Sequence, residues 1–310
     1  MIMPNTHHAA SWCVKDLNEL SAPLMICGGV YGNLEAFQAL IERADNLRIP
    51  AENIIHTGDI IACCADPLAT IELMVGCNIQ AIQGNVENSL IRNAKDCECH
   101  EGEDAGSDAV LSAQWYKFLD KTLLDEHRHY IARLPHQLTF RCEGRTIRVV
   151  HGSVSSINQF IFASASTEVF KAEFEHADAD VIISGHSGIP FTRRFGDKIW
   201  HNSGGLGLPA NDGTHRVWYS LVLPDPEFGV RFEHHSLDYD YKKTQHKMKF
   251  HRLPESFTET LGTGLWPNQE KLPAAERSRA GKPLKPEMLI IDDQDFSSRL
   301  KTPLEQAAAF

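Results

Sequence analysis

Short apolar runs alternate along the first part of the chain with segments whose apolar residues recur at helical spacing. Residues 23–27, 53–56 and 78–82 are apolar runs that end in glycine or polar residues, and they predict strands. Residues 34–47 and 67–75 repeat apolar positions every three or four residues and predict helices between those strands. Strands that alternate with helices in this way are typical of an α/β protein.

The pattern changes after Pro135. Residues 110–132, just before that point, predict a helix, and residues 137–142 and 146–150 predict a hairpin. A further helix and three strands are expected at 165–177, 180–184, 199–200 and 217–223. Residues 93–107 are polar and acidic and predict an insertion loop.

These patterns divide the chain into three parts. We expect an N-terminal extension at 1–22, one domain at 23–225, and a C-terminal extension at 226–310. The C-terminal extension is expected to be partly helical and then, from about Leu253, a loosely ordered tail, because proline, glycine and charged residues dominate there.

Composition narrows the class of partner. The chain has 310 residues and a formal net charge of −11 at pH 7, and an acidic surface repels polyanions, so we expect no nucleic-acid partner. The N-terminus lacks the basic start and apolar core of a signal peptide, and no apolar run approaches the roughly 20 residues that span a bilayer. We therefore expect a soluble, cytoplasmic protein without a membrane partner, whose eight cysteines are reduced thiols.

Four polar residues each follow a predicted strand, namely Asp59, Asn85, His151 and His186. Loops at the carboxyl ends of strands are where open α/β sheets gather their ligands. One carboxylate, one amide oxygen and two imidazoles form a mixed set that suits Mn, Fe or Zn. Taken singly, each residue also fits a turn or a cap, and together they could form a polar cluster without metal. We favour the metal, because two buried histidines without one would need other partners.

The order of short motifs resembles the calcineurin-like metallophosphoesterases, in particular their small bacterial phosphodiesterases and phosphatases. The motifs are Gly29-Val-Tyr31, Gly58-Asp59, Gly84-Asn-Val-Glu87, His151-Gly152 and Gly185-His-Ser-Gly188. The resemblance implies a four-layer α/β/β/α sandwich with two mixed sheets. It also implies metal-dependent hydrolysis of phosphate monoesters or diesters, with a small phosphorylated molecule as substrate.

The chain departs from the family pattern at three ligand positions. Gly29, Tyr31 and Gly188 stand where the family has Asp, His and His. By the resemblance, these are the ligands private to one of two metals, whereas the set for the other metal is complete. This selective loss favours one retained divalent ion, Mn, Fe or Zn, over drift to an inert scaffold.

Further residues around the motifs are candidates for chemistry. Tyr31 could donate a hydrogen bond to a phosphoryl oxygen, or could simply fill the space of a lost ligand. Glu87 is a second catalytic candidate, with the alternative of orienting ligands. Gly29, through its backbone amide, and Arg193 are candidates for binding substrate phosphate, although an arginine in a turn between strands is commonly a solvated edge.

Cys97 and Cys99 lie in the predicted insertion loop. If that loop folds toward the site, the two thiolates could provide an additional soft metal position, since thiolates bind Zn and Fe well. The alternative is a thiol pair in a surface loop.

Two functions remain open at this stage. The first is a metal-dependent phosphoester hydrolase that works with the single retained metal. The second is a catalytically weak or inactive relative that binds a phosphorylated ligand or a protein partner. Metal content and turnover of nitrophenyl phosphates with added Mn discriminate between them.

Overall fold

Two β-sheets form the centre of the molecule in the computed structural model, which describes residues 12–97 and 107–292. The larger sheet consists, in spatial order, of β1 (Val14–Glu19), β5 (Gln137–Cys142), β6 (Arg145–Val149), β7 (Val181–Ser184), β9 (Lys198–Asn202), β8 (Phe191–Phe195) and β12 (Ile290–Asp292). The smaller sheet consists of β11 (Gly229–Leu237), β10 (Val217–Asp225), β2 (Leu24–Cys27), β3 (Ile54–His56) and β4 (Gln80–Ala81). Both sheets contain parallel and antiparallel pairs.

The two sheets pack face to face through apolar side chains. Ile26 and Ile55 of the smaller sheet belong to the same buried cluster as Phe140, Val149 and Ile183 of the larger one. These strands carry branched and aromatic residues, which favour extended backbone and bury well between sheets. This interface is the inner core of the molecule.

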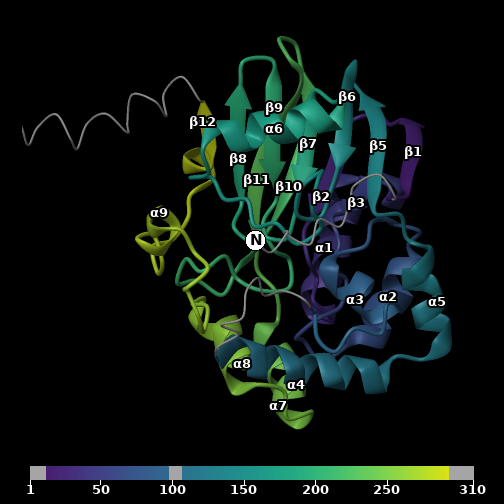
Figure 1. Cartoon of the computed structure of the whole chain (residues 1–310), viewed down its shortest axis with the longest axis vertical. Helices are drawn as coiled ribbons and strands as arrows, with labels where there is room; N and C mark the ends of the chain where they lie inside the picture. The colour runs from purple at the N-terminus through teal and green to yellow at the C-terminus, as the bar shows by residue number, and fades with distance from the viewer. Residues whose placement is uncertain (1–11, 98–106, 293–310) are drawn as a thin grey trace, which may run out of the picture.

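Helices cover the two outer faces (Figure 1). The helices α1 (Leu34–Leu47), α2 (Pro67–Gly76), α3 (Asn85–Ile91), α4 (Ser107–Thr122) and α5 (Asp125–Arg133) lie on the side of the smaller sheet, and α6 (Thr167–Ala177) packs on the larger one. For example, Phe37 of α1 shares a buried cluster with Met25 of β2, and Phe170 of α6 contacts Trp200 of β9. The predicted four-layer α/β/β/α sandwich is therefore confirmed.

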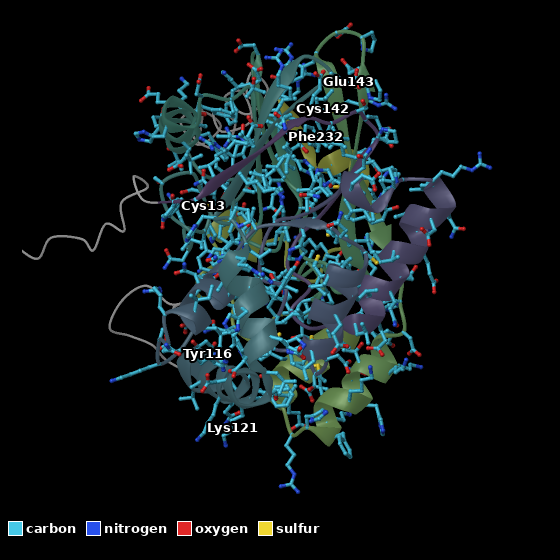
Figure 2. The ribbon with its side chains drawn as sticks, turned by 90° about the vertical axis from the view of Figure 1, so that its right-hand side faces the viewer. Cys13, Tyr116, Lys121, Cys142, Glu143 and Phe232 are labelled. Carbon is cyan, nitrogen blue, oxygen red and sulfur yellow. The ribbon has the colours of Figure 1, made fainter. Side chains whose placement is uncertain are left out.

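The C-terminal extension folds back along the molecule. It contains α7 (Tyr241–Phe250), α8 (Glu255–Thr263) and α9 (Ala274–Arg277), then a short 3-10 turn (Pro286–Met288) and β12. Figure 1 shows α7 and α8 beside α4 at one end of the molecule. In the perpendicular view of Figure 2, Tyr116 and Lys121 of α4 lie at that end, and Cys142, Glu143 and Phe232 lie at the other.

Several predicted boundaries need correction. The expected N-terminal extension contributes β1, which pairs in parallel with β5, and the C-terminal extension supplies β11 and β12 to the two sheets. The expected loosely ordered tail after Leu253 instead contains α8, α9, the 3-10 turn and β12, joined by loops, as far as residue 292. The single helix expected at 110–132 is two helices, because the chain turns at 123–124. Within the described residues, no helix has both the length and the apolar character that crossing a membrane requires.

Candidate metal centre

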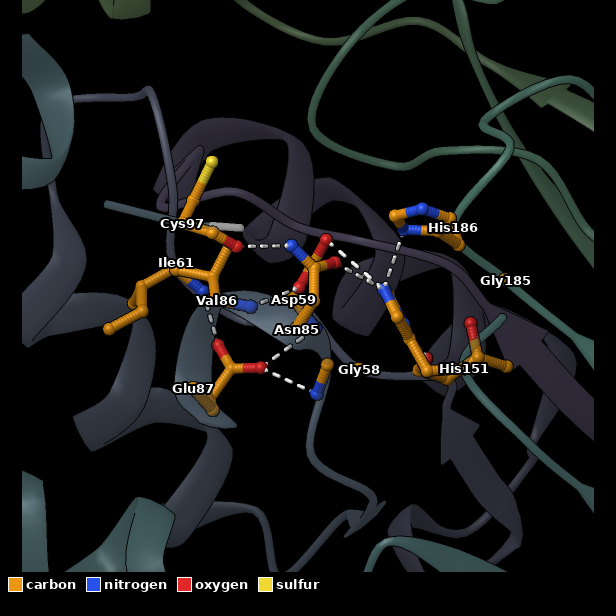
Figure 3. Close-up of polar contacts among 12 residues, drawn as sticks. Gly58, Asp59, Ile61, Asn85, Val86, Glu87, Cys97, His151, Gly185 and His186 are labelled. Carbon is orange, nitrogen blue, oxygen red and sulfur yellow. Dashed lines mark hydrogen bonds and ion pairs between the residues drawn. The ribbon is translucent and has the colours of Figure 1, made fainter. Parts of the chain in front are cut away.

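Four side chains, three from loops and one from the start of α3, meet beyond the carboxyl ends of the parallel strands (Figure 3). His151 Nε2 lies 3.0 Å from Asn85 Oδ1, 3.1 Å from His186 Nδ1 and 3.3 Å from Asp59 Oδ2. Asp59 and Asn85 follow β3 and β4 of the smaller sheet, and the histidines follow β6 and β7 of the larger one. The structure thus brings together the four residues that the sequence singled out.

His151, Asn85 and Asp59 each make a further hydrogen bond, and this bond determines which of their atoms faces the other ligand candidates. The Thr57 carbonyl oxygen lies 2.7 Å from His151 Nδ1, and because a carbonyl only accepts, the proton of the neutral ring is on Nδ1. Asn85 Nδ2 donates to the Cys97 carbonyl, which turns Oδ1 toward His151. Asp59 Oδ1 accepts from the Val86 N–H and leaves Oδ2 toward the centre. The inward atoms of these three residues are therefore all acceptors.

A cation fits this arrangement. Acceptor atoms about 3 Å apart repel one another unless a proton or a metal lies between them. In the protein without metal, burial opposes protonation of His151, but the Asp59 carboxylate outweighs it and raises the pKa of that ring. Ligands about 2.1 Å from one ion are separated by roughly 3.0 Å at right angles and 3.4 Å in a tetrahedron, which matches the observed spacings. Asp59, His151 and His186 each offer one possible metal-ligand atom, and these three atoms lie within 4.8 Å of one another.

Glu87 lies behind the ligands. Its carboxylate accepts backbone N–H bonds from Asp59 (2.9 Å), Ile61 (3.2 Å) and Gly84 (2.8 Å). It is fully buried, and burial together with the charge of Asp59 raises its pKa to about 7. Glu87 is not among the described residues that line the neighbouring cavity. The structure thus favours the orienting role over the predicted catalytic one.

Close approach of the loops explains the glycine in the Gly84-Asn85 motif. A Cβ on Gly84 would collide with Oδ1 and the backbone nitrogen of Asp59. The glycine allows the turn before α3 to pack directly against the turn after β3. Asp59 and Asn85 can therefore face the same ion.

Asn202 positions the loop that carries His186. Its Nδ2 donates to the Gly185 carbonyl at 2.6 Å and to Ser187 Oγ at 3.0 Å, and its Oδ1 accepts from the Gly204 N–H. His186 itself has a φ of 57°, a left-handed conformation that costs energy in a non-glycine residue. Burial and the neighbouring His151 lower the pKa of His186 to about 3, so its ring is the neutral form that binds metals.

Tyr31 and Gly29 are packed against each other. A Cβ on Gly29 would collide with the Tyr31 ring and lie 2.9 Å from its hydroxyl oxygen. Burial and the nearby Asp59 charge raise the pKa of Tyr31, so the phenol keeps its proton. The aromatic ring therefore takes the place that a side chain at position 29 would need.

Gly188 is covered in a similar way by the C-terminal extension. Its Cβ position would lie 3.2 Å from Cζ2 of Trp266. The indole is fixed, because its Nε1 donates to the Pro209 carbonyl and its backbone N–H to Asn211 Oδ1. An aromatic ring thus stands next to each of the two glycines.

Arg193 is placed away from the ligands. Its guanidinium donates to the carbonyls of Ala163 and Ala165 and packs over the rings of Phe170 and Phe195. The residue is fully buried on β8 beneath α6, and it does not line the cavity next to the ligands. The predicted contact with substrate phosphate is therefore wrong for Arg193, because its donors already serve to hold the loop before α6.

The cysteine hypothesis also changes. Cys97 is disulfide-bonded, and Figure 3 shows that its backbone carbonyl, rather than its sulfur, contacts the candidate ligand Asn85. A disulfide sulfur is not the thiolate that zinc or iron binds, so the predicted additional ligand is wrong for Cys97. The expectation that every cysteine is reduced is wrong at the same position. Cys99 lies outside the described residues.

A cavity opens directly beside the ligand atoms. Asp59, Asn85 and His186 line one part of it, and the described remainder includes Trp115 of α4, Phe160, Trp266 and Lys271. Sequence reasoning assigned no role to these last four residues. The sequence offered one hint of such a lining, the tryptophan at position 266. Its hydrophobic pattern does not show that residues so far apart in the sequence meet.

The four-layer α/β/β/α sandwich, with Asp59, Asn85, His151 and His186 at the carboxyl ends of its strands, agrees with the resemblance of the sequence motifs to the calcineurin-like metallophosphoesterases. The chain matches the calcineurin-like phosphoesterase superfamily domain over residues 14–222, and it belongs to that superfamily. No curated protein matches the chain.

Two solved structures show the same fold. A hypothetical protein from Pyrococcus horikoshii superposes with a TM-score of 0.65 at 20% identity, over 80% of this chain and 100% of that chain. A metallophosphoesterase from Sphaerobacter thermophilus superposes with a TM-score of 0.60 at 22% identity, over 79% of this chain and 100% of that chain. At these identities the likeness concerns the fold alone.

Proposed function

We propose that this protein hydrolyses phosphate esters with one divalent transition metal, Mn, Fe or Zn, held by Asp59, Asn85, His151 and His186. The observation that carries the proposal is the convergence of Asn85 Oδ1, His186 Nδ1 and Asp59 Oδ2 at 3.0–3.3 Å from His151 Nε2. A bound ion supplies Lewis-acid charge to a phosphoryl oxygen and acidifies water. Membership of the phosphoesterase superfamily supports the same chemistry.

The packing around Gly29 and Gly188 supports one ion rather than two. The Tyr31 ring occupies the space beside Gly29, and the Trp266 ring lies beside Gly188. Neither a phenol nor an indole offers the carboxylate or imidazole that the family resemblance would require there. Aromatic side chains therefore stand where a second set of ligands would be needed.

Tyr31 is proposed to bind a phosphoryl oxygen. It lines the cavity together with Asp59, and its raised pKa keeps the hydroxyl proton available for donation. One protonated phenol offers a hydrogen bond where a second ion would offer charge. We expect slower turnover than in an enzyme with two ions.

Leaving groups that need little protonation should react fastest. Val86 stands where the family resemblance places a proton-donating histidine, and no other imidazole than His186 lines the cavity within the described residues. His186 is a metal ligand in this proposal and is not available to protonate the leaving group. An ester whose alcohol is itself acidic, such as a nitrophenol, does not need that proton.

The test combines metal analysis with turnover. The purified full chain, grown with Mn, Fe and Zn, should carry one metal equivalent and hydrolyse p-nitrophenyl phosphate or bis-p-nitrophenyl phosphate. Asp59→Asn should lose metal and activity together, whereas Asp45→Asn, on the exposed face of α1, should lose neither.

Two outcomes would overturn the proposal. Two tightly bound equivalents that both disappear in Asp59→Asn would contradict the single ion. Tight binding of inorganic phosphate with no metal-dependent turnover would favour the alternative, a binding protein that retains the old pocket.

A further inference from the structure

The cavity beside the candidate metal centre has room for more than a phosphoryl group. It opens to solvent and its volume is about 210 Å³, which is several times the roughly 30 Å³ that one water molecule occupies in the liquid. Asp59, Asn85 and His186 line it where a phosphoryl group would lie. The rest of the space must accommodate whatever the phosphate is attached to.

The described walls of this cavity are predominantly aromatic and apolar. Six aromatic residues line it, and these are Tyr31, Trp115, Phe160, Phe162, Phe257 and Trp266. They come from the loop after β2, from α4, from the loop before α6, from α8 and from the segment after α8. Aromatic walls of this kind bind flat apolar groups through their faces and edges.

Two phenylalanine rings lie beside the candidate metal ligand His186. The Phe160 ring centroid lies 4.0 Å from that of His186 with the two rings tilted by 35°, and the Phe162 ring is parallel to the Phe160 ring at a centroid distance of 6.1 Å. A flat group held against Phe160 would therefore lie next to the ligand atoms. The distance suits an ester whose ring is attached directly to the phosphate or through a short linker.

Positive charge around the cavity is limited. Among the lysines and arginines in the described part of the chain, only Lys271 lines the cavity. Its Nζ lies 5.2 Å from the Phe160 ring centroid. Arg193 is held elsewhere by backbone carbonyls. A site with one metal and one lysine, against the Asp59 carboxylate, suits a ligand of low charge better than a polyphosphate.

One polar group in the aromatic part has no partner. Trp115 is 4% exposed, and its Nε1–H has no hydrogen-bond partner in the described structure. A buried N–H without an acceptor is costly.

We propose that this cavity selects phosphodiesters that carry a flat aromatic ester group, with the ring among Trp115, Phe160 and Trp266 and the phosphate at the metal ligands. The inference rests on the proposed hydrolase function and adds the class of substrate. Water adds to phosphorus, the P–O bond to one ester group breaks, and that group leaves as an alcohol or phenol with a proton from the water.

Diesters fit better than monoesters for two reasons. A diester carries one negative charge at pH 7, whereas a monoester carries close to two, because its second pKa is about 6. A diester also replaces a charged oxygen with a second organic group, which the apolar lining can contact. Simple aryl esters and nucleoside esters share the flat ring, so the experiment includes one of each.

Binding is the first readout, because it does not depend on turnover. Calorimetric titration of the full chain, as purified and after metal chelation, compares diphenyl phosphate with dimethyl phosphate and phenyl phosphate. Diphenyl phosphate should bind at least tenfold more tightly than dimethyl phosphate in both preparations. Equal affinities would overturn the aromatic part of the proposal whether or not the protein is a hydrolase.

Variants assign the binding to the cavity. Trp266→Ala should weaken diphenyl phosphate at least fivefold, and Trp266→Phe should restore most of the affinity, since it keeps a ring. Lys271→Ala should weaken both diphenyl and dimethyl phosphate. Phe250→Ala and Lys249→Ala, exposed positions on α7, are the matched controls and should bind as the parent does. The proposal would be overturned if both Trp266→Ala and Lys271→Ala left the affinity for diphenyl phosphate unchanged.

Turnover is the second readout. With Mn added, bis-p-nitrophenyl phosphate and the p-nitrophenyl ester of thymidine 5′-monophosphate should both exceed p-nitrophenyl phosphate in kcat/KM by at least tenfold. Preference for the thymidine ester identifies a nucleoside source, and preference for the bis ester a simple aryl source. A preference for the monoester overturns the diester assignment, and tight binding of diphenyl phosphate without turnover of any ester refutes the hydrolase but leaves the aromatic selectivity standing.

Discussion

Glu87 connects two loops that carry metal-ligand candidates. It accepts backbone N–H bonds from Asp59 and Gly84 through Oε2 and from Ile61 through Oε1. A glutamine at this position offers one acceptor oxygen, so at least one of the buried N–H groups faces an amide N–H instead. Groups that orient metal ligands in this way commonly contribute a factor of 10–100 to metal affinity.

Glu87→Gln should therefore lower both stability and metal affinity. We expect a loss of about 1–3 kcal/mol in the free energy of unfolding, the cost of leaving a buried donor unsatisfied, measured by urea denaturation. Metal titration should show at least a tenfold weaker affinity. Glu259→Gln, exposed on α8, is the control. If only kcat falls while stability and metal affinity are unchanged, Glu87 acts on the substrate as the sequence predicted.

Tyr31 allows a separate test at the level of a single hydroxyl. The ring packs over Gly29, and Tyr31→Phe keeps that packing while removing the hydrogen-bond donor. Loss of one hydrogen bond to phosphate costs about 1 kcal/mol, or roughly a fivefold fall in kcat/KM. The metal content should not change. An unchanged kcat/KM for nitrophenyl esters would show that Tyr31 only fills space.

The ligand set could be predicted from single residues, and the surrounding groups could not. An apolar run precedes each of the four residues Asp59, Asn85, His151 and His186, and this regularity can be read from the sequence alone. In the structure these runs are strands that end at the same side of their sheets. The role of Arg193 depends on which face of β8 it occupies, and its neighbour Arg194 is chemically identical in the sequence. Only packing beneath α6 distinguishes the two.

At the level of elements, α7 is attached to the loop that leads from Tyr31 into α1. Lys247 Nζ lies 2.6 Å from Glu35 Oε1 and 2.7 Å from Asp66 Oδ2, and Thr244 Oγ1 donates to Asn33 Oδ1 and Glu35 Oε2. Burial opposes ionisation of Glu35, but its bonds to lysine outweigh burial and lower the pKa of this carboxyl. The C-terminal extension is thereby fixed to the first helix.

Lys247→Met should loosen this attachment. The Glu35 side chain is 4% exposed and would lose its closest cation, whereas the Lys247 side chain is 25% exposed, so solvent screening limits the effect. We expect a loss of about 1–2 kcal/mol in the free energy of unfolding, measured with urea at pH 7. Lys249→Met, exposed on the same helix, should cost less than half a kcal/mol, roughly as other surface changes do. Equal losses in the two variants would contradict the attachment.

Elements built from continuous patterns were predictable, and those that depend on distant partners were not. The helix over 34–47 and the strand over 137–142 agree with α1 and β5 residue for residue. By contrast, β1 has a largely polar, exposed sequence and is a strand because it pairs with β5. The segment after Leu253 is ordered because its aromatic residues close the cavity and β12 pairs with β8.

A buried polar network joins the two sheets that form the centre of the fold. Thr192 Oγ1 of β8 lies 2.9 Å from His201 Nδ1 of β9 and 2.8 Å from His234 Nε2 of β11, and His234 Nδ1 lies 3.2 Å from Ser220 Oγ of β10. The His201 ring also stacks on Phe232 of β11. Strands β8 and β9 belong to one sheet, and β10 and β11 to the other. The contact between the sheets is therefore polar at this place, whereas the cluster around Ile26, Ile55 and Phe140 is apolar.

Protonation of this network should destabilise the fold. Burial lowers the pKa of His234 from 6.5 to about 3, and burial with the neighbouring His234 lowers the pKa of His201. The unfolded chain takes up protons at these histidines below about pH 6.5, whereas the folded protein takes one up at His234 only near pH 3. Stability therefore falls as the pH falls through that window, by up to about 1.4 kcal/mol per pH unit for each such histidine.

His234→Gln isolates one share of this effect, because an amide can still hydrogen-bond to Thr192 and Ser220 but does not titrate. The free energy of unfolding, measured with urea at pH 6.5, 5.5 and 4.5, should fall less steeply in the variant, by about 1.4 kcal/mol per pH unit at the acid end. His235→Gln is the matched control, because the side chain of His235 is 37% exposed on the same strand. A parent and a His234→Gln variant with the same slope would mean that His234 does not carry the acid sensitivity of the fold.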